Sequence, residues 1–423
     1  MSDVRIAMVT SRYPYGGADQ VAMLLVQALE HRHEVHFITT GEVDETCREG
    51  GHHRVVLALP RRQRFWHHYW NPSVVRKLKA HLARIEPDVV HFHSVANRTF
   101  SAAAILVSHD YPTVWSLHDV WSQCIWSAAR PPSCEGMLHG CPFCRAMPGL
   151  SMASRFLKES VWRRAEVDLI VPSVWLGDRV AKSALSDKPM HVVPNGVPFE
   201  RFAGADGTGV RHRLGIPPDV RVVLFAGQMQ TNWKGYQDLL RIAARILETD
   251  ENIWFVFVGP TGEPPRGHPR ILFTGAVTYD EIPRYYAAAD VFAYPTHADV
   301  FGLVVVEAMA AGLPVVTYRT GGVAELVLKG TTGFVIEEGD ETGFETALRN
   351  LLDDPDRRRI MGRAARVRVK RHFTLDEQVA RTEGLYGQVI AEREAKSGRT
   401  PGTREPLVSV VMPAYNTGRF IAQ

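Results

Sequence analysis

The sequence predicts an α/β protein with two doubly wound domains, each built on a parallel sheet, that face one another across a cleft. Short apolar runs alternate with amphipathic stretches along most of the chain, as in successive βαβ units. The series is interrupted at residues 198–218, where GADGTGV and IPPD have the composition of a linker. With 423 residues, 45% of them hydrophobic and 22% charged, the chain is large enough for two or three globular domains.

Each apolar run is expected to be a strand, and each amphipathic stretch between two runs a helix. In the first half, the expected strands are residues 5–10, 35–39, 89–93, 113–117, 169–172 and 191–193, and the expected helices are 18–30, 72–85 and 101–108. In the second half, the expected strands are 222–226, 254–258, 271–273, 291–294 and 315–318. The expected helices there are 235–248, 279–288, 303–311 and 323–329, and residues 341–394 are expected to be mostly helical.

These elements suggest where the domains begin and end. We place the first domain at residues 1–195, with a Cys-rich insertion at 120–147, and the second at residues 196–374. A last helix is expected at 375–395, and residues 396–423 combine a linker, SGRTPGTREP, with the truncated start of a further domain. One strand and a turn cannot form a domain alone.

Composition excludes several classes of function. The net charge is +3, from 49 basic and 46 acidic residues, so we expect no nucleic-acid partner. The start, MSDVRIAMVTSRYP, lacks the basic and long apolar parts of a signal peptide and is expected to contain a strand. Five cysteines without an export signal indicate a reducing compartment, so we expect a cytoplasmic protein.

The most informative segment is residues 298–316, ADVFGLVVVEAMAAGLPVV. Apolar residues fill nearly every position from Phe301 onward, so the segment must be buried, and an isolated buried carboxylate at Glu307 would be costly. Glu307 therefore needs a protein partner or a ligand; the simpler alternative is a carboxylate satisfied by the backbone. A membrane span is excluded because Glu307 lies in the middle of the run.

The same segment has the features of a site for a phosphorylated, polyhydroxylated ligand. Gly302 permits a positive φ angle, or close approach of the backbone, just before the expected helix. The start of a helix offers free N–H groups to an anion. Asp299, Glu307 and the nearby pair Gly321–Gly322 complete the pattern.

Two loops at strand ends carry further candidates. Gly16 and Gly17 follow the first strand and permit close approach to a ligand at a helix N-terminus, although a plain tight turn explains them equally well. Their spacing is not the dinucleotide motif Gly-x-Gly-x-x-Gly, which disfavours a hydride-transfer enzyme. In LFAGQMQTNWKG, Lys234 could bind a diphosphate and Gly227 would leave space for it; the alternative is a solvated lysine.

The stretch WSLHDVW places His118 and Asp119 at the carboxyl end of a first-domain strand, where cleft-lining groups emerge. His118 could donate a hydrogen bond to a substrate hydroxyl or stabilise charge. The alternative is a structural histidine capped by Asp119.

Four cysteines lie within 21 residues and end in Cys-x2-Cys, which suits a tetrahedral structural zinc site in an irregular loop. The expected ligands are Cys124, Cys134, Cys141 and Cys144. His139 is a substitute ligand, and unmetallated thiols are the alternative. A closed site of this kind has no catalytic role.

The stretch RRQRFWHHYWNPSVVRKLKAH, at residues 61–81, mixes basic and aromatic residues ahead of an amphipathic helix. It could rest on an anionic membrane surface, at the inner face of a membrane, or hold an acceptor. A solvated helix with an aromatic underside explains it equally well.

Taken together, the motifs resemble glycosyltransferase family 4, the retaining enzymes with the GT-B fold. The resemblance covers residues 4–392 and is carried by YPYGGADQVAMLLVQAL, VVHFHS, WSLHD, VPNGV, AGQMQTNWKG, THADVFGLVVVEAMAAGLPVV and TGGVAELV. The Cys-rich insertion is similar to a subset found among capsule and exopolysaccharide enzymes. The stretch TLDEQVARTEGLYGQVI resembles the family's closing helix, which returns to the first domain, and PLVSVVMPAYNTGRFI resembles the first strand of glycosyltransferase family 2.

The resemblance implies roles for individual residues. It implies a donor-binding set of Gly16, Gly17, Gly227, Gln228, Lys234, Asp299, Val300, Phe301, Gly302, Leu303, Glu307, Gly321 and Gly322. Catalytic roles would fall to His118, Lys234, Asp299 and Glu307, and the acceptor side to Arg12, Asp119 and Asn195. Glu307 would bind the ribose hydroxyls, Lys234 the diphosphate, and His118 would face the transferred sugar.

The implied activity is sugar transfer from a nucleoside-diphosphate sugar, with UDP or GDP favoured, to a saccharide or lipid-linked saccharide in cell-surface polysaccharide synthesis. No catalytic metal is implied. Two positions depart from the family pattern: Asp299 replaces the usual first Glu, and Gln228 replaces the usual Arg. The alternatives are therefore a catalytically weak nucleotide-sugar-binding module, or an epimerase or hydrolase of nucleotide sugars on the same fold.

Overall fold

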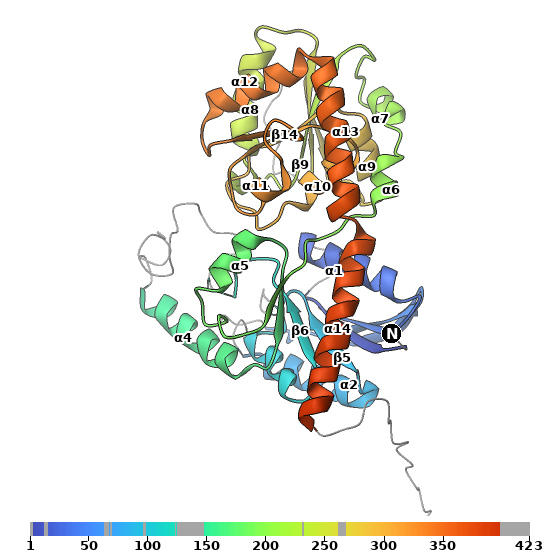
Figure 1. Cartoon of the computed structure of the whole chain (residues 1–423), viewed down its shortest axis with the longest axis vertical. Helices are drawn as coiled ribbons and strands as arrows, with labels where there is room; N and C mark the ends of the chain where they lie inside the picture. Colours follow the sequence, from blue (N-terminus) through green and yellow to red (C-terminus); the bar gives the residue numbers. More distant parts are fainter. Residues whose placement is uncertain are drawn as a thin grey trace, which may run out of the picture.

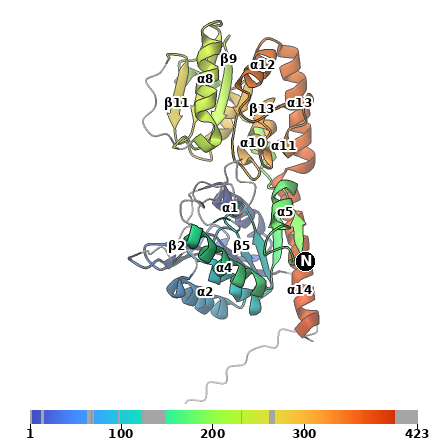
Figure 2. The ribbon, with the colours of Figure 1, turned by 90° about the vertical axis from the view of Figure 1, so that its left-hand side faces the viewer.

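The structure is a computed structural model that describes residues 3–11, 16–62, 67, 70–95, 99–122, 124, 148–230, 232–260 and 268–397. The described chain forms two α/β lobes stacked along its long axis (Figure 1, Figure 2). Most of the expected Cys-rich insertion, and the linker and strand expected near the C-terminus, lie outside the described residues. The division into domains at the residues given above stays a prediction.

The lower lobe in Figure 1 contains a sheet with the strand order β3-β4-β2-β1-β5-β6-β7-β8. Every neighbouring pair is parallel except β3 with β4. The strands are β1 (Arg5–Val9), β2 (Glu34–Gly41), β3 (Glu45–Glu49), β4 (His52–Ala58), β5 (Val89–Phe92), β6 (Thr113–Ser116), β7 (Asp168–Val171) and β8 (Met190–Val192). Its helical elements are α1 (Gly17–Leu29), α2 (Pro72–Ile85), the 3-10 helix η2 (Ala102–His109), α4 (Pro148–Arg164) and α5 (Val174–Val180).

The upper lobe contains an all-parallel sheet with the order β11-β10-β9-β12-β13-β14. The strands are β9 (Arg221–Ala226), β10 (Ile253–Val258), β11 (Ile271–Gly275), β12 (Val291–Tyr294), β13 (Val315–Tyr318) and β14 (Gly333–Ile336). Its helices are α6 (Phe199–Ala203), α7 (Thr208–Arg213), η3 (Asn232–Lys234), α8 (Tyr236–Leu247), α9 (Ile282–Ala287), α10 (Leu303–Ala310), α11 (Val323–Leu326), α12 (Glu341–Leu352) and α13 (Pro355–His372). The two parallel α/β sheets confirm the predicted fold class.

Helix α14 (Leu375–Ser397) follows α13 directly and runs down the lower lobe (Figure 1). Its residues Val379, Leu385, Tyr386 and Val389 belong to the core that α1 and one face of the first sheet form. The C-terminal end of the described chain therefore packs on the half in which the chain begins. Among the described residues, no helix is both long enough and apolar enough to cross a membrane.

The structure differs locally from the sequence prediction. Residues 198–218 are not a plain linker, because α6 and α7 lie there and bury Phe202 and Val210 in the core of the upper lobe. The helix expected at residues 101–108 is present as the 3-10 helix η2. Strand β3 was not expected because its sequence, ETCRE, is polar and mostly exposed, as an edge strand can be.

Candidate functional site

Lys234 and Asp299 form the centre of the candidate site, in the loops that follow β9 and β12. The ammonium group of Lys234 lies 2.7 Å from Oδ2 of Asp299 and also donates to the carbonyl of Ala298 at 3.3 Å. Tyr294, the last residue of β12, donates its hydroxyl to the same carboxylate oxygen at 2.8 Å. Both loops lie at the carboxyl edge of the sheet, where open α/β sheets bind ligands.

The carboxyl group of Asp299 is ionised at neutral pH. Burial raises its pKa, but the opposing effects of Lys234, Tyr294 and the backbone N–H of Phe301 are stronger, so the pKa lies below its ordinary value. Asp299 thus neutralises Lys234 in this structure. A diphosphate that binds Lys234 must share the ammonium group with Asp299 or displace it.

The Gly321–Gly322 pair packs on the backbone next to Asp299. A Cβ on Gly321 would lie 1.8 Å from the carbonyl oxygen of Asp299, and one on Gly322 would lie 2.1 Å from that of Val300. Gly322 also donates its N–H to the carbonyl of Asp299 at 3.2 Å. In the described structure, Gly321 and Gly322 therefore leave room for the backbone of Asp299 and Val300. Their close packing fixes the position of Asp299.

Gly302 precedes α10 with a φ of 94°, which confirms the expected positive-φ turn before the helix. No side chain caps this end of the helix. Phe301 is buried in the upper core, and Leu303 packs against both the upper core and the core beneath α14. The start of α10 therefore joins the two lobes.

Glu307 is buried in α10 and has a protein partner, Tyr286 of α9. The Tyr286 hydroxyl donates to Oε2 of Glu307 at 2.8 Å. Burial raises the pKa of Glu307 to about 7, although the Tyr286 hydrogen bond and the charge of Arg201 oppose the rise. No hydrogen bond or ion pair of the described structure joins Glu307 to Lys234 or Asp299, so the structure does not connect the expected catalytic residues into one network.

His118 lies at the end of β6, in the other lobe, as part of a row of histidines. Its Nε2 is 2.8 Å from Nδ1 of His93, and the two rings stack with centroids 5.0 Å apart. His91 follows at 4.2 Å between ring centroids and contacts the Tyr386 hydroxyl through Nδ1 at 2.6 Å. Burial lowers the pKa of His118 to about 4, so its ring is neutral at pH 7. The row links the candidate sugar-facing residue to helix α14.

Asp119 does not cap His118 in this structure. Its Oδ1 accepts the backbone N–H of Trp121 at 2.8 Å, which fixes the turn after β6. Burial raises the pKa of Asp119 to about 6, and the nearby charge of Lys158 opposes the rise.

Gly16 and Gly17 lie at the start of α1. Gly16 and Gly17 are exposed, and a Cβ added to either would meet no atom within 4 Å. Gly16 is the N-cap of α1 and no side chain caps that end. The geometry leaves space for a ligand at the helix start. Arg12, expected on the acceptor side, lies outside the described residues.

The remaining candidates lie around these groups. Gly227 directly follows β9, and a Cβ on it would lie 3.7 Å from the Lys234 side chain. Gln228 is exposed next to it. Asn195 is buried in the connection between the lobes, close to the bridge that pairs Val197 with Thr374.

The lobes touch beside the candidate site. Ser173 donates its hydroxyl to the carbonyl of Val300 at 2.7 Å, and the Glu325 carboxylate accepts the N–H groups of Val174 and Trp175 at the start of α5. A cavity adjoins this contact. It is lined by Pro172, Ser173, Val174, Val192, Pro194, Phe301, Glu325, Leu326, Arg368, His372, Phe373 and Arg381. The lining of this cavity includes neither Lys234 nor Asp299. The candidate site is therefore defined by the side-chain contacts of these two residues and not by the cavity.

His297 is a histidine near the site that the sequence reasoning did not identify. Its ring contacts Asp238 through Nε2 at 2.9 Å and Glu338 through Nδ1 at 2.8 Å. The Asp238 hydrogen bond raises the pKa of His297. Its backbone N–H binds the carbonyl of Trp233, so this histidine ties the loop before Asp299 to the loop of Lys234. The sequence signal that could have identified it is its position in PTHADVF, two residues before Asp299.

Of the four expected zinc ligands, the structure describes Cys124 alone. Cys124 is buried, forms no disulfide, and its carbonyl accepts a hydrogen bond from Lys158 at 3.0 Å. Cys134, Cys141, Cys144 and the substitute His139 lie outside the described residues.

Comparison with known families matches both halves of the chain. Residues 15–201 match the family described as Glycosyltransferase Family 4, and residues 220–354 match the one described as Glycosyl transferases group 1. D-inositol 3-phosphate glycosyltransferase 1 of Catenulispora acidiphila is 28% identical over 69% of this chain and 75% of its own length. Sulfoquinovosyl transferase SQD2 of Arabidopsis thaliana is 30% identical over 70% of this chain. The chain spans little more than half of that relative's length, 56%.

Solved structures have the same fold. Sucrose-phosphate synthase from Thermosynechococcus elongatus superimposes with a TM-score of 0.71 at 18% identity, over 92% of this chain and all of the other. Anabaena Alr3699/HepE in complex with UDP and glucose gives a TM-score of 0.66 at 18% identity, over 91% of this chain and 99% of the other. The chain therefore has the GT-B fold, and its two halves, residues 15–201 and 220–354, each match a glycosyltransferase family model.

Proposed function

We propose that the chain transfers a sugar from a nucleoside-diphosphate sugar to a saccharide or lipid-linked saccharide acceptor, with retention of the anomeric configuration. The observation that carries the proposal is the contact of Lys234 with Asp299 at the carboxyl edge of the second sheet. This contact brings together, in adjoining loops, a cation that could bind a diphosphate and an anion that could bind a sugar hydroxyl.

In the proposed reaction, the bond from the anomeric carbon to the diphosphate oxygen breaks. The acceptor hydroxyl oxygen bonds to that carbon on the same face, and the departing diphosphate oxygen takes the hydroxyl proton. No protein nucleophile and no catalytic metal take part. Lys234 and the N–H groups at the start of α10 stabilise the negative charge that develops on the diphosphate.

Each remaining candidate has a place in this scheme. Glu307 binds the ribose, and Asp299 contacts the sugar. His118, which is neutral, can donate or accept a hydrogen bond with a sugar hydroxyl. Asp299 is one methylene shorter than the family's usual Glu, so a water must bridge or the sugar must lie closer.

UDP and GDP are the favoured nucleotides, and UDP is the first to test because the Anabaena protein with this fold was solved with UDP and glucose. We place the reaction in cell-surface polysaccharide synthesis, in the cytoplasm at the inner membrane face. The exposed Trp70 and the basic residues at 61–62 could provide a peripheral contact with an anionic membrane.

We also propose a structural zinc ion held by Cys124, Cys134, Cys141 and Cys144. The described member fits a structural role, since Cys124 is buried against Lys158 and forms no disulfide. Thiolate ligands would fasten this loop to the first sheet without a part in catalysis.

The transfer assay that tests the proposal compares Lys234→Ala with Lys329→Ala, which removes an exposed lysine of the same half. We expect Lys234→Ala to reduce transfer by at least about 100-fold, the scale at which a charge-stabilising donor acts. Lys329→Ala should leave it unchanged. Near-normal transfer by Lys234→Ala would remove Lys234 from the diphosphate role.

Two other outcomes identify the rival functions. Conversion or hydrolysis of the nucleotide sugar without any acceptor would favour an epimerase or a hydrolase. Tight binding without turnover across many acceptors would favour a weakly catalytic binding module, for which the replacement of the usual Arg by Gln228 is the supporting observation.

A further inference from the structure

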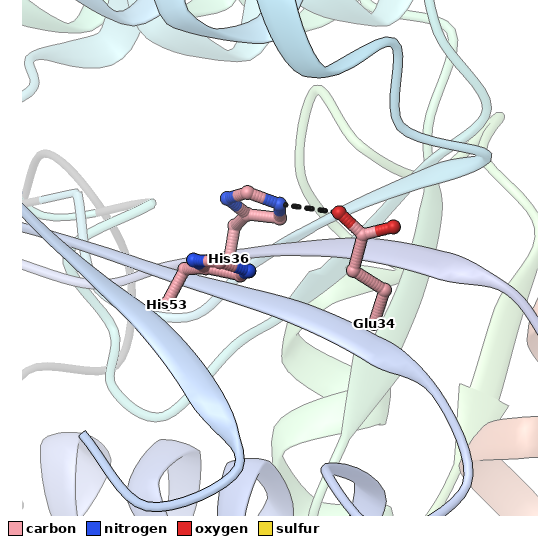
Figure 3. A group of neighbouring side chains, drawn as sticks. All are labelled: Glu34, His36 and His53. Carbon is pink, nitrogen blue, oxygen red and sulfur yellow. Dashed lines mark hydrogen bonds and ion pairs between the residues drawn. The ribbon is translucent and has the colours of Figure 1, made fainter. Parts of the chain in front are cut away.

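A cluster of one carboxylate and two imidazoles lies at the other end of the first sheet from the candidate site. Glu34 and His36 lie on β2, and His53 lies on the neighbouring strand β4 in register with His36. Nε2 of His36 is 3.0 Å from Oε1 of Glu34. The rings of His36 and His53 stack at 4.6 Å with an angle of 13° between their planes. Figure 3 shows the two rings one above the other, with Glu34 at their edge.

We propose that Glu34, His36 and His53 bind a divalent transition-metal ion of the Zn²⁺ type. Each residue offers one ligand atom, and these three atoms lie within 4.8 Å of one another. Two imidazoles and a carboxylate are a ligand set that zinc accepts, at about 2.0–2.2 Å from the metal. To bind one ion, the three ligand atoms must approach one another, and the half-buried His53 and Glu34 are the side chains that would have to move.

The buried nitrogens at this place are the second observation that indicates a ligand. His36 is 7% exposed, and its Nδ1 has no hydrogen-bond partner. His81 of α2 is equally buried, its ring lies 5.6 Å from that of His36, and its Nε2 also has no partner. A buried polar atom without a partner is costly. An ion with bound water would give these imidazoles partners that the protein does not.

Two arginines face the cluster and limit its affinity. Nε of Arg5 lies 2.8 Å from Oε2 of Glu34, so a metal would bind Oε1 and replace its contact with His36, and Nη2 of Arg84 lies 2.9 Å from Nδ1 of His81. Their positive charge opposes a cation, while the hydrogen bond from Arg5 orients the carboxylate as the outer partner of a metal ligand does. Arg5→Gln should therefore change zinc affinity without abolishing the site.

The position of the cluster indicates a structural role. Glu34 begins β2 and His53 is the second residue of β4, so the ligands lie at the amino ends of these parallel strands. The candidate transferase site lies at the carboxyl ends of strands. A bound ion would fasten β4, and with it the edge strand β3, to β2, and would not reach the reacting groups.

The proposal is tested by isothermal titration calorimetry, in which zinc is added to the chelator-treated full chain. The wild type is compared with His53→Gln and Glu34→Gln. Both residues are half-buried, which favours folded variants, and circular dichroism checks this. His31→Gln is the control, because His31 is an exposed histidine outside the cluster. We expect each ligand variant to lose one zinc-binding step. The loss of zinc affinity at that step should exceed the factor of about 10–100 that a change in an outer hydrogen-bond partner causes. The control should bind zinc like the wild type.

X-ray absorption separates this ion from one held by the cysteines, since only the latter has sulfur ligands. The step that His53→Gln removes should be the one with nitrogen and oxygen ligands alone. Equal zinc affinity and stoichiometry in the wild type and both variants would overturn the proposal. So would a wild-type chain whose only bound zinc has sulfur ligands.

Discussion

The ammonium group of Lys234 and the carboxylate of Asp299 form an ion pair of 2.7 Å across 65 positions of the sequence. The pair is only partly exposed, and the carboxylate holds two further hydrogen bonds, from Tyr294 and the N–H of Phe301. Lys234, which we propose to bind a diphosphate, is thus paired with the Asp299 carboxylate in this structure.

Asp299→Asn should therefore strengthen the binding of nucleoside diphosphates while it weakens transfer. The substitution removes the negative charge that competes for Lys234 and keeps the shape of the side chain. It should also lower the free energy of unfolding by about 2 kcal/mol, because Lys234 loses its charged partner. Calorimetric titration with UDP, beside urea denaturation, measures both effects. Weaker UDP binding by a folded Asp299→Asn would contradict the competition.

Glu307→Gln should change how stability depends on pH. The pKa of Glu307 rises from 4.5 to about 7 on folding, so the native state holds a proton that the unfolded chain has released between these values. Wild-type stability should therefore fall, relative to Glu307→Gln, as the pH rises from about 4.5 to about 7, by about 3 kcal/mol in total.

Urea denaturation of both proteins at several pH values between 4.5 and 8 measures this difference, and Gln keeps an oxygen for the Tyr286 hydroxyl. The difference should be constant above about pH 7. A difference that does not change with pH would show that Glu307 is ionised in the folded protein.

Tyr386→Phe should loosen the contact of α14 with the first sheet. The phenol is buried and lies 2.6 Å from Nδ1 of His91, which would lose its partner. We expect a loss of about 1–3 kcal/mol in the free energy of unfolding, the cost of an unsatisfied buried group. Tyr236→Phe, whose hydroxyl binds the exposed Gln237, should change stability by less than about 0.5 kcal/mol and is the control.

Gly17→Ala and Gly322→Ala should show which glycine leaves space for a ligand and which one is needed for packing within the protein. A Cβ on Gly17 meets no protein atom within 4 Å, so folding should be unaffected, while a donor at the start of α1 would lose affinity. A Cβ on Gly322 would lie 2.1 Å from a backbone oxygen, so this variant should be destabilised without any ligand. Thermal unfolding with and without UDP distinguishes the two. An unchanged midpoint in Gly322→Ala would contradict the packing described for it.

The fold could be predicted where burial leaves a continuous apolar run or a regular amphipathic one. Residues 291–294, 315–318 and 72–85 match β12, β13 and α2 at both ends. Strand β3 could not be predicted, because its polar residues at a sheet edge show no apolar pattern. Helices α6 and α7 were hidden because they are short and are flanked by glycines and prolines, and only Phe202 and Val210, which anchor them, carried a signal.

The candidate site residues could be selected from the sequence, but their partners in the structure could not. The buried position of Glu307 demanded a partner, yet nothing local identified Tyr286 in another helix. The Gly321–Gly322 pair suggested space for a ligand, whereas the structure fills that space with the backbone of Asp299 and Val300. Such pairings depend on the tertiary contacts between loops, which spacing along the chain does not specify.

Thermal stabilisation of the full chain by UDP, GDP, ADP, CMP and NAD tests the proposed donor site most directly. A clear rise in the unfolding midpoint is expected with one nucleoside diphosphate, as mass action requires of any ligand that binds only the folded state. The rise should be reduced in Lys234→Ala and retained in Lys329→Ala. A rise with NAD alone would contradict the transferase proposal, and no rise with any of the five would contradict a nucleotide site around Lys234.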